Sequence, residues 1–123
     1  MKIKPRESVS VSVPPAPVDP NNIHLDKPIY TLSVASEILE THPRTLRMYE
    51  HLNMIKPKRT VTNRRRYSQR DLMKLQAIQT LTRKHGVNLA GVRYILALLK
   101  TLQKSGLEAP DGLKDLDVSL LEV

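Results

Sequence analysis

The spacing of apolar and polar residues after residue 28 predicts two short helices in succession. Apolar residues at positions 34, 35, 38 and 39 follow the period of an amphipathic helix, and Ser33 precedes them at the position of an N-cap. Pro43 suits the first position of a second helix over residues 43–52, because its missing N–H has no intrahelical partner there. Two short helices joined by a tight turn, the second one basic, indicate a helix-turn-helix.

Two further helices are predicted downstream. Ser68 and Asp71 have the spacing of a capping box at the start of the third helix, and Gly86 supplies the left-handed residue that ends it. Asn88 is the expected cap of the fourth helix. The apolar stripes consist of Leu72, Leu75, Ile78 and Leu81 in the helix over 69–84, and of Val92, Ile95, Leu96, Leu99 and Leu102 in the helix over 89–103.

The stretch between the second and third helices is strongly basic. Residues 56–70 contain seven basic side chains and no acidic one. Pro57 and Asn63 mark turns and Thr60–Thr62 is β-prone, which predicts a short hairpin, or wing. Another β-prone run, Ile29–Leu32, precedes the first helix. The sequence therefore predicts a mainly α fold, a winged helix-turn-helix with two further helices.

The two ends of the chain differ from its middle. Residues 1–26 contain five of the nine prolines, and their apolar residues show no sustained period, which predicts a disordered arm. The alternating valines of Val9–Val13 could instead form a short strand, but such a strand has no partner to pair with. We divide the remainder into a winged helix-turn-helix domain over 27–104 and a short C-terminal segment over 105–123. A short helix over 111–123, for dimer contacts or partner docking, is predicted by the spacing of Leu113, Leu116, Leu120 and Leu121.

Charge is concentrated in the same middle region. The net charge is +8, and residues 27–104 carry 16 basic and four acidic side chains. Basic side chains release counterions from phosphates, so nucleic acid is the favoured partner, with membrane surfaces and acidic proteins as alternatives. The absence of cysteine excludes disulfides and thiolate metal sites. No apolar run approaches the roughly 20 residues of a membrane span and no secretory signal follows Met1, so we expect a cytoplasmic location.

Catalytic and metal-binding patterns are not found in the sequence. No nucleophile stands beside a base, no glycine-rich phosphate loop is present, and the histidines have no metal-ligand spacing. We therefore expect no enzyme activity, no metal site and no cofactor. Glu50 is interpreted as a salt-bridge partner of a neighbouring Arg or Lys, and Leu46 as a core residue. Tyr49 has two interpretations, a core residue or a phosphate contact.

Several ordered blocks resemble the MerR family of transcription regulators. They are Thr45–Glu50, Met54–Arg59 and Arg64–Ser68, and the stretch Gly86–Val92 is similar to the HspR branch of that family. The likeness covers about residues 29–102. It implies a winged helix-turn-helix whose second helix enters the major groove of DNA while the wing lies along the backbone.

The resemblance also implies which residues contact DNA. Arg65 takes the place of the arginine in the family's Tyr-Arg-x-Tyr wing pattern, and Tyr67 that of its second tyrosine. The sequence departs from the pattern at Arg64, where the family has the first tyrosine, and at Asn53, where a glycine usually ends the recognition helix. Asn tolerates the left-handed conformation, so the turn is expected to persist. With the basic residues of the wing, the expected DNA-binding set is Arg44, Thr45, Arg47, Tyr49, Lys56, Lys58, Arg59, Arg64, Arg65, Arg66 and Tyr67.

The predicted function is sequence-specific binding of double-stranded DNA. One short recognition helix reads only a few base pairs, so a homodimer on an inverted repeat is expected. The resemblance to the HspR branch implies a nucleoid-associated repressor of heat-shock chaperone genes, with the DnaK chaperone as co-repressor. The alternative is a basic module that coats nucleic acid without sequence preference, and competition with random DNA separates the two.

Overall fold

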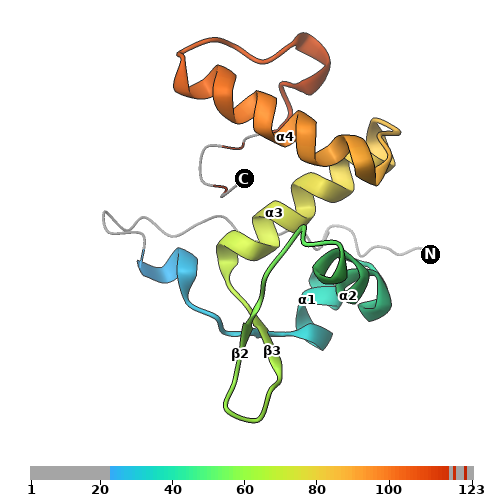
Figure 1. Cartoon of the computed structure of the whole chain (residues 1–123), viewed down its shortest axis with the longest axis vertical. Coiled ribbons are helices and arrows are strands. Elements are labelled where there is room, and N and C mark those ends of the chain that lie inside the picture. The colour runs from blue at the N-terminus through green and yellow to red at the C-terminus, as the bar shows by residue number, and fades with distance from the viewer. Residues whose placement is uncertain (1–22, 117, 119–120, 122–123) are drawn as a thin grey trace, which may run out of the picture. The chain divides into compact units, whose positions relative to one another are not determined.

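The computed structural model describes residues 23–116, 118 and 121 (Figure 1). These residues fall into two compact units that divide after Leu72, and each unit is described by itself. Most of the predicted arm, including the Val9–Val13 alternation, lies outside the described residues. Its last four residues, Ile23–Asp26, form a 3-10 turn, η1, in which Leu25 is buried. These four residues of the expected arm therefore have a defined structure.

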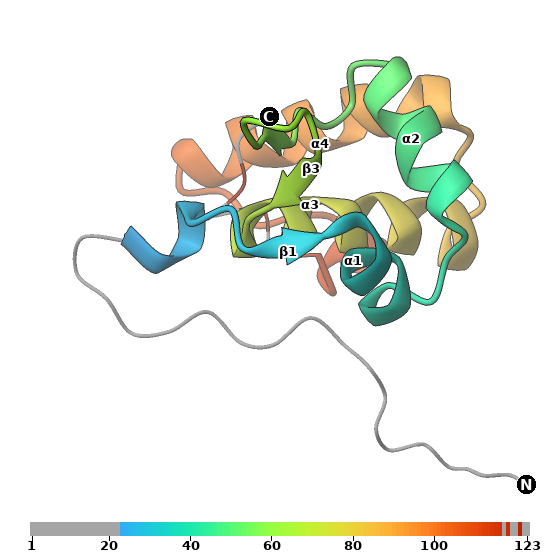
Figure 2. The same ribbon diagram turned by 90° about the horizontal axis from the view of Figure 1, so that it is seen from below.

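The first unit enters its helix-turn-helix directly from a short strand. β1 (Tyr30–Thr31) leads without a linker into α1 (Leu32–Ile38), as Figure 2 shows. The hydroxyl of Thr31 accepts a hydrogen bond from the backbone N–H of Val34 at 3.1 Å. Thr31 is therefore the N-cap, and the prediction of Ser33 is wrong. Pairing in the sheet holds Thr31 extended, so the helix starts at the next residue.

The second helix, α2 (Pro43–His51), confirms the prediction that Pro43 occupies its first turn. The Nδ1 atom of His42 caps this helix by accepting a hydrogen bond from the backbone N–H of Arg44 at 3.0 Å. Beyond the end of α2, Asn53 has a φ of +62°, as expected for a residue that replaces glycine in the left-handed position.

A small antiparallel sheet confirms the predicted wing. β2 (Lys58–Arg59) and β3 (Arg65–Tyr67) form a hairpin, and the strand order is β1-β3-β2. The β-prone residues Thr60–Thr62 belong to the turn and not to a strand. Asn63, with a φ of +65°, closes this turn by donating its N–H to the carbonyl of Thr60 at 2.8 Å. The buried apolar side chains of the first unit are Leu25, Ala35, Leu39, Leu46, Tyr49, Met54, Ile55, Tyr67 and Leu72.

The third helix, α3 (Gln69–Gln79), begins with the predicted capping box. The backbone N–H of Ser68 donates to the carboxylate of Asp71, and the N–H of Asp71 donates to the hydroxyl of Ser68, both at 3.0 Å. A π-helical turn, η2 (Thr80–Lys84), continues the chain to the predicted end of the helix. Gly86 follows with a φ of +66°, as predicted.

The second unit is built on α4 (Leu89–Lys104). The side chain of Asn88 accepts a hydrogen bond from the backbone N–H of Gly91 at 3.0 Å, which confirms Asn88 as the cap. The predicted apolar face of α4 is buried at three of its positions and half-buried at Ile95 and Leu102. The buried apolar side chains of this unit are Leu75, Ala77, Ile78, Leu81, Val92, Leu96, Leu99, Val118 and Leu121.

The helix predicted over residues 111–123 is wrong for the residues that the structure describes. Only a 3-10 turn, η3 (Asp111–Leu113), is helical among them. The ammonium group of Lys100 instead donates hydrogen bonds to the carbonyls of Val118 at 3.1 Å and Leu121 at 2.9 Å, and both apolar side chains are buried. A short isolated helix has little stability of its own, so burial of single side chains decides the path of this segment. These two residues belong to the core, and not to an exposed docking segment.

Candidate nucleic-acid interface

The helix α2 has a core face and a solvent face. Leu46 is fully buried and Tyr49 is 5% exposed, so the ring of Tyr49 belongs to the core. Thr45 is half-buried. Each exposed side chain is three or four positions away from two of the others, which places them on a single outward face. These residues are Arg44, Arg47, Met48 and His51.

Sequence reasoning did not include Met48 in this face. Its side chain is 42% exposed although it is apolar. The four-residue step from Arg44 and the three-residue step to His51 were the available signal. A guanidinium group matches the O6 and N7 atoms of guanine, and an apolar side chain matches the methyl group of thymine. The outward face of α2 therefore carries both kinds of chemistry that read base edges.

A carboxylate joins α2 to both strands of the wing. Oε2 of Glu50 lies 2.8 Å from Nη2 of Arg59, and Oε1 of Glu50 lies 2.5 Å from Nε of Arg65. The interpretation of Glu50 as a salt-bridge partner is confirmed. Burial raises the pKa of the Glu50 carboxyl, but the hydrogen bonds from Arg65 and Arg59 and the charges of both outweigh it, so this pKa lies below its usual value. We call this cluster, Glu50 with Arg59 and Arg65, the wing brace.

The two faces of the hairpin differ in charge. Arg59 is paired opposite Arg65, and both side chains share Glu50. The neighbouring pair, Lys58 opposite Arg66, points to the other face because side chains alternate along a strand. Within the described part of the chain, neither Lys58 nor Arg66 has an acidic partner; Arg66 donates to the carbonyl of Arg65 at 2.9 Å. We call Lys58 and Arg66 the open cation pair, since like charges directly opposite each other repel unless an anion binds.

Tyr67 lies inside the first unit. Its side chain has no exposed surface, and its hydroxyl has no hydrogen-bond partner among the described residues. Burial raises the pKa of this hydroxyl to about 12. The alternation along β3 places Tyr67 on the same inner face as Arg65. The structure thus gives Tyr67 a core position, in contrast to the DNA contact that the family pattern implied.

The remaining basic residues of the expected set lie on the surface. Lys56 and Arg64 are both exposed, the latter at the tip of the hairpin. The tip is held by its own hydrogen bonds: the N–H of Thr60 donates to the carbonyl of Arg64 at 2.9 Å, and the N–H of Arg64 donates to Oγ1 of Thr60 at 3.1 Å. The hairpin tip that carries Arg64 is therefore held by two hydrogen bonds.

Other kinds of site find little support in the described residues. None of the helices there is both long and apolar enough to cross a membrane. In the same part of the chain, no three His, Cys, Asp or Glu side chains are grouped so that they could hold a metal ion. Three of the four histidines have separate places: His42 caps α2, His51 lies on its outward face, and Nε2 of His85 is 3.5 Å from Oδ1 of Asp115.

A cationic outward helix face together with a braced basic hairpin defines a winged helix-turn-helix of the DNA-binding class, and the predicted fold class is confirmed. The model of the MerR HTH family regulatory proteins matches residues 30–99, and the chain belongs to this family.

Two kinds of relative extend this result. The heat shock protein HspR of Streptomyces coelicolor is 41% identical over 80 residues, which cover 65% of this chain and 53% of that protein. The HTH-type transcriptional regulators GlnR of Bacillus anthracis and Bacillus cereus are 30% identical over 89 residues, or 72% of this chain and 67% of theirs. The chain thus aligns with about half the length of the HspR relative. The resemblance to the family and to its HspR branch is confirmed.

Proposed function

We propose that this protein is a sequence-specific repressor that binds inverted repeats in the promoters of heat-shock chaperone genes as a homodimer. The outward face of α2 supports this proposal most directly. Arg44 and Arg47 would donate to guanine bases, and Met48 would contact thymine methyl groups in the major groove. A basic module that only coats nucleic acid has no need for an apolar residue exposed between cations.

The wing residues divide into two roles in this proposal. The open cation pair, with Lys56 and Arg64, supplies phosphate contacts that hold the helix in register without reading sequence. Arg59 and Arg65 hold Glu50 and so fix the wing to α2. The role of Arg65 proposed here is therefore mainly positional, whereas the family pattern implied a direct backbone contact.

The regulatory part of the proposal rests on the similarity to the heat shock protein HspR. We propose that the protein acts in the cytoplasm at the nucleoid, that a second copy completes the inverted repeat, and that the DnaK chaperone is its co-repressor. A two-fold dimer doubles the base contacts of one short helix, which one copy alone cannot supply.

The test compares promoter fragments of chaperone genes with random fragments of equal length at physiological salt, with and without purified DnaK. We expect tighter binding to the promoter fragments and a further gain when DnaK is added. Equal affinity for both sets would contradict the specific repressor and favour the coating module. Promoter-specific binding that does not change when DnaK is added would contradict only the proposed role of DnaK as co-repressor.

A further inference from the structure

Charge is divided unevenly within the second unit. Residues 73–104 carry six basic side chains and no acidic one, whereas the C-terminal segment over 105–123 carries five acidic side chains and one basic. Opposite charges attract each other, so the segment can serve as an internal counterion for the basic helices. A phosphate backbone competes for cations of the same kind.

One carboxylate of the segment contacts a basic turn of this unit. Nζ of Lys84, the last residue of η2, lies 2.6 Å from Oδ2 of Asp115, and Nε2 of His85 lies 3.5 Å from Oδ1 of the same carboxylate. The hydrogen bond from Lys84 and its charge lower the pKa of the Asp115 carboxyl, so this group is ionised at neutral pH. Nε2 of His85 is buried and has no hydrogen-bond partner among the described residues. Two nitrogen atoms thus converge on one carboxylate, an arrangement that also suits two oxygens of a phosphate.

Two other acidic residues of the segment are paired inside the segment itself. Nζ of Lys114 lies 3.2 Å from Oε1 of Glu108 and 3.3 Å from Oδ1 of Asp111. These pairs neutralise charge within the segment and cover no cation of the helices. Asp115 and Asp111 therefore differ in what they cover, although each contributes one negative charge to the same segment.

The contact at Asp115 is open to solvent. The side chain of Lys84 is 65% exposed and that of Asp115 is 34% exposed. An exposed ion pair contributes little net stability, because water and salt ions solvate both partners when it opens. A phosphate that approaches from solvent can therefore replace Asp115 on Lys84 without unfolding the unit.

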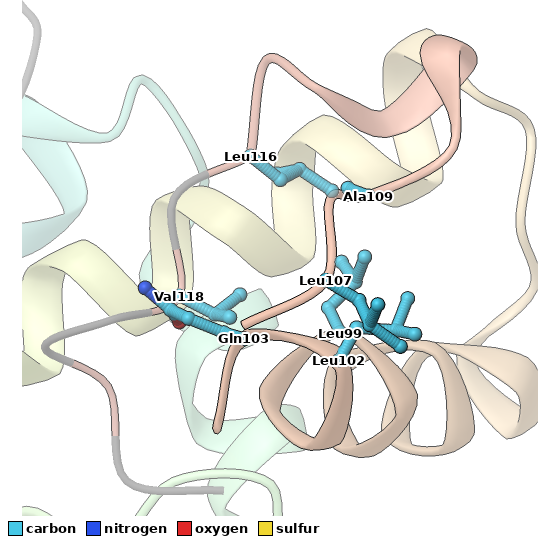
Figure 3. Close-up of a pocket in the computed structure, with 7 residues that line it drawn as sticks. All are labelled: Leu99, Leu102, Gln103, Leu107, Ala109, Leu116 and Val118. Atoms are coloured by element: carbon cyan, nitrogen blue, oxygen red, sulfur yellow. The ribbon is translucent and has the colours of Figure 1, made fainter. Parts of the chain in front are cut away.

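The apolar contact of the segment is incompletely filled. A pocket of about 200 Å³ lies between the segment and the end of α4 (Figure 3), and its lining includes Leu99, Leu102, Leu116 and Val118. Side chains that face an unfilled space lose van der Waals contacts on that side. The segment next to Asp115 is therefore held less firmly than a close-packed core, which favours its displacement.

We propose that the C-terminal segment is autoinhibitory, because Asp115 keeps Lys84 and His85 from DNA phosphates and so lowers the affinity of the protein for DNA. This inference rests on the DNA binding proposed above. Carboxylate and phosphate oxygens both accept charge-assisted hydrogen bonds, so either anion can occupy the position. A phosphate contact reads no sequence, so the competition changes affinity and leaves sequence discrimination as it is.

The experiment measures the affinity of the full chain for a random duplex at salt concentrations between about 50 and 200 mM. The test variant is Asp115→Asn. The matched control is Asp111→Asn, which changes the net charge equally and leaves Lys114 paired with Glu108. We expect the slope of log affinity against log salt concentration to be steeper for Asp115→Asn than for the control by about 0.9, so its advantage should grow about threefold from the highest to the lowest salt. Equal slopes and equal affinities of the two variants would overturn the proposal.

A second variant tests whether Lys84 is the cation that Asp115 covers. Lys84→Gln alone should change the affinity no more than Lys114→Gln does, because Asp115 already occupies Lys84 in the wild type. Combined with Asp115→Asn, Lys84→Gln should remove the gain in affinity. A gain that persists in the combined variant would overturn the proposal. Circular dichroism of each variant verifies that the helices are intact.

A promoter fragment measured in parallel separates this inference from the proposed function. Asp115→Asn should tighten binding to promoter and random duplexes by the same factor, so the ratio of the two affinities should equal that of the wild type. A wild type without preference for the promoter fragment would contradict the proposed function, while the comparison on random duplexes would still test the segment. A gain confined to the promoter fragment would overturn the competition between Asp115 and phosphates.

Discussion

Replacing Glu50 by Gln should loosen the wing from the recognition helix without changing the shape of the side chain. The variant removes the charge that Arg59 and Arg65 share, at a position where the side chains of Glu50 and Arg65 are 22% and 24% exposed. Exposed ion pairs contribute about 0.2–1 kcal/mol each. Two such pairs on one carboxylate therefore correspond to a loss of about 0.4–2 kcal/mol in the free energy of unfolding.

The same variant separates stability from charge in DNA binding. Glu50→Gln raises the net positive charge by one, so binding to random DNA should stay equal or become tighter. Specific binding should weaken by about 2–30-fold, because DNA must now order a wing that is no longer fixed to α2 and the lost energy is about 0.4–2 kcal/mol. Urea unfolding followed by circular dichroism, and fluorescence anisotropy with specific and random duplexes, measure the two effects.

The matched control is Glu37→Gln, since Glu37 is an exposed glutamate of α1 and the change in net charge is the same. It should alter neither stability nor the ratio of specific to random affinity. If the two variants gave equal stability and equal affinity ratios, the reasoning about the wing brace would be refuted.

Three further predictions concern the same domain. Arg47→Ala should reduce the discrimination between specific and random DNA by about 1–3 kcal/mol. Lys58→Ala should weaken binding to all DNA sequences alike and reduce the slope of log affinity against log salt concentration by about one. Equal changes in the two variants during salt titrations would contradict these roles. Tyr67→Phe should keep DNA affinity and leave stability unchanged or raise it by about 1 kcal/mol, because a buried hydroxyl without a partner is removed; a clear loss of DNA affinity in anisotropy would show that the hydroxyl reaches DNA. The pKa of the Glu50 carboxyl is lower in the folded protein than in the unfolded chain, so the stability that Glu50 contributes is present above the unfolded pKa and is lost as the pH falls through the folded pKa. Acid unfolding of wild type and Glu50→Gln should therefore converge at low pH, and a constant difference in stability would count against the brace.

Local features of the fold were the ones that the sequence predicted well. Pro43, the Ser68–Asp71 capping box, Asn88 and the left-handed Gly86 each act through hydrogen bonds or φ angles within a few residues. Such interactions depend on the order of residues alone. They located three helix starts and one helix end before any tertiary contact was known.

Features that depend on distant pairing were missed or left open. The cap of α1 is Thr31 and not Ser33 because the sheet holds Thr31 extended, and nothing local distinguishes the two hydroxyls. The C-terminal leucine pattern predicted a helix, but burial and the hydrogen bonds of Lys100 decide the path of that segment.

The candidate site shows the same limit. The basic stretch predicted DNA contacts for six of its seven cations, yet the register Arg59 opposite Arg65 brings two of them to Glu50 and leaves Lys58 and Arg66 on the other face. A charge count cannot reveal such a division, because it follows from strand pairing. Glu50 itself was predicted to pair with a neighbouring Arg or Lys, but its two partners were not identified.

The most direct test of the central claim is selection of bound duplexes from a random-sequence library at physiological salt, with wild-type protein and Arg47→Ala in parallel. We predict that the wild type enriches an inverted repeat with guanines in each half-site, and that Arg47→Ala loses this preference while it still binds DNA. If the wild type enriched no sequence, or if Arg47→Ala enriched the same repeat equally well, the account of α2 as the reading helix would be contradicted.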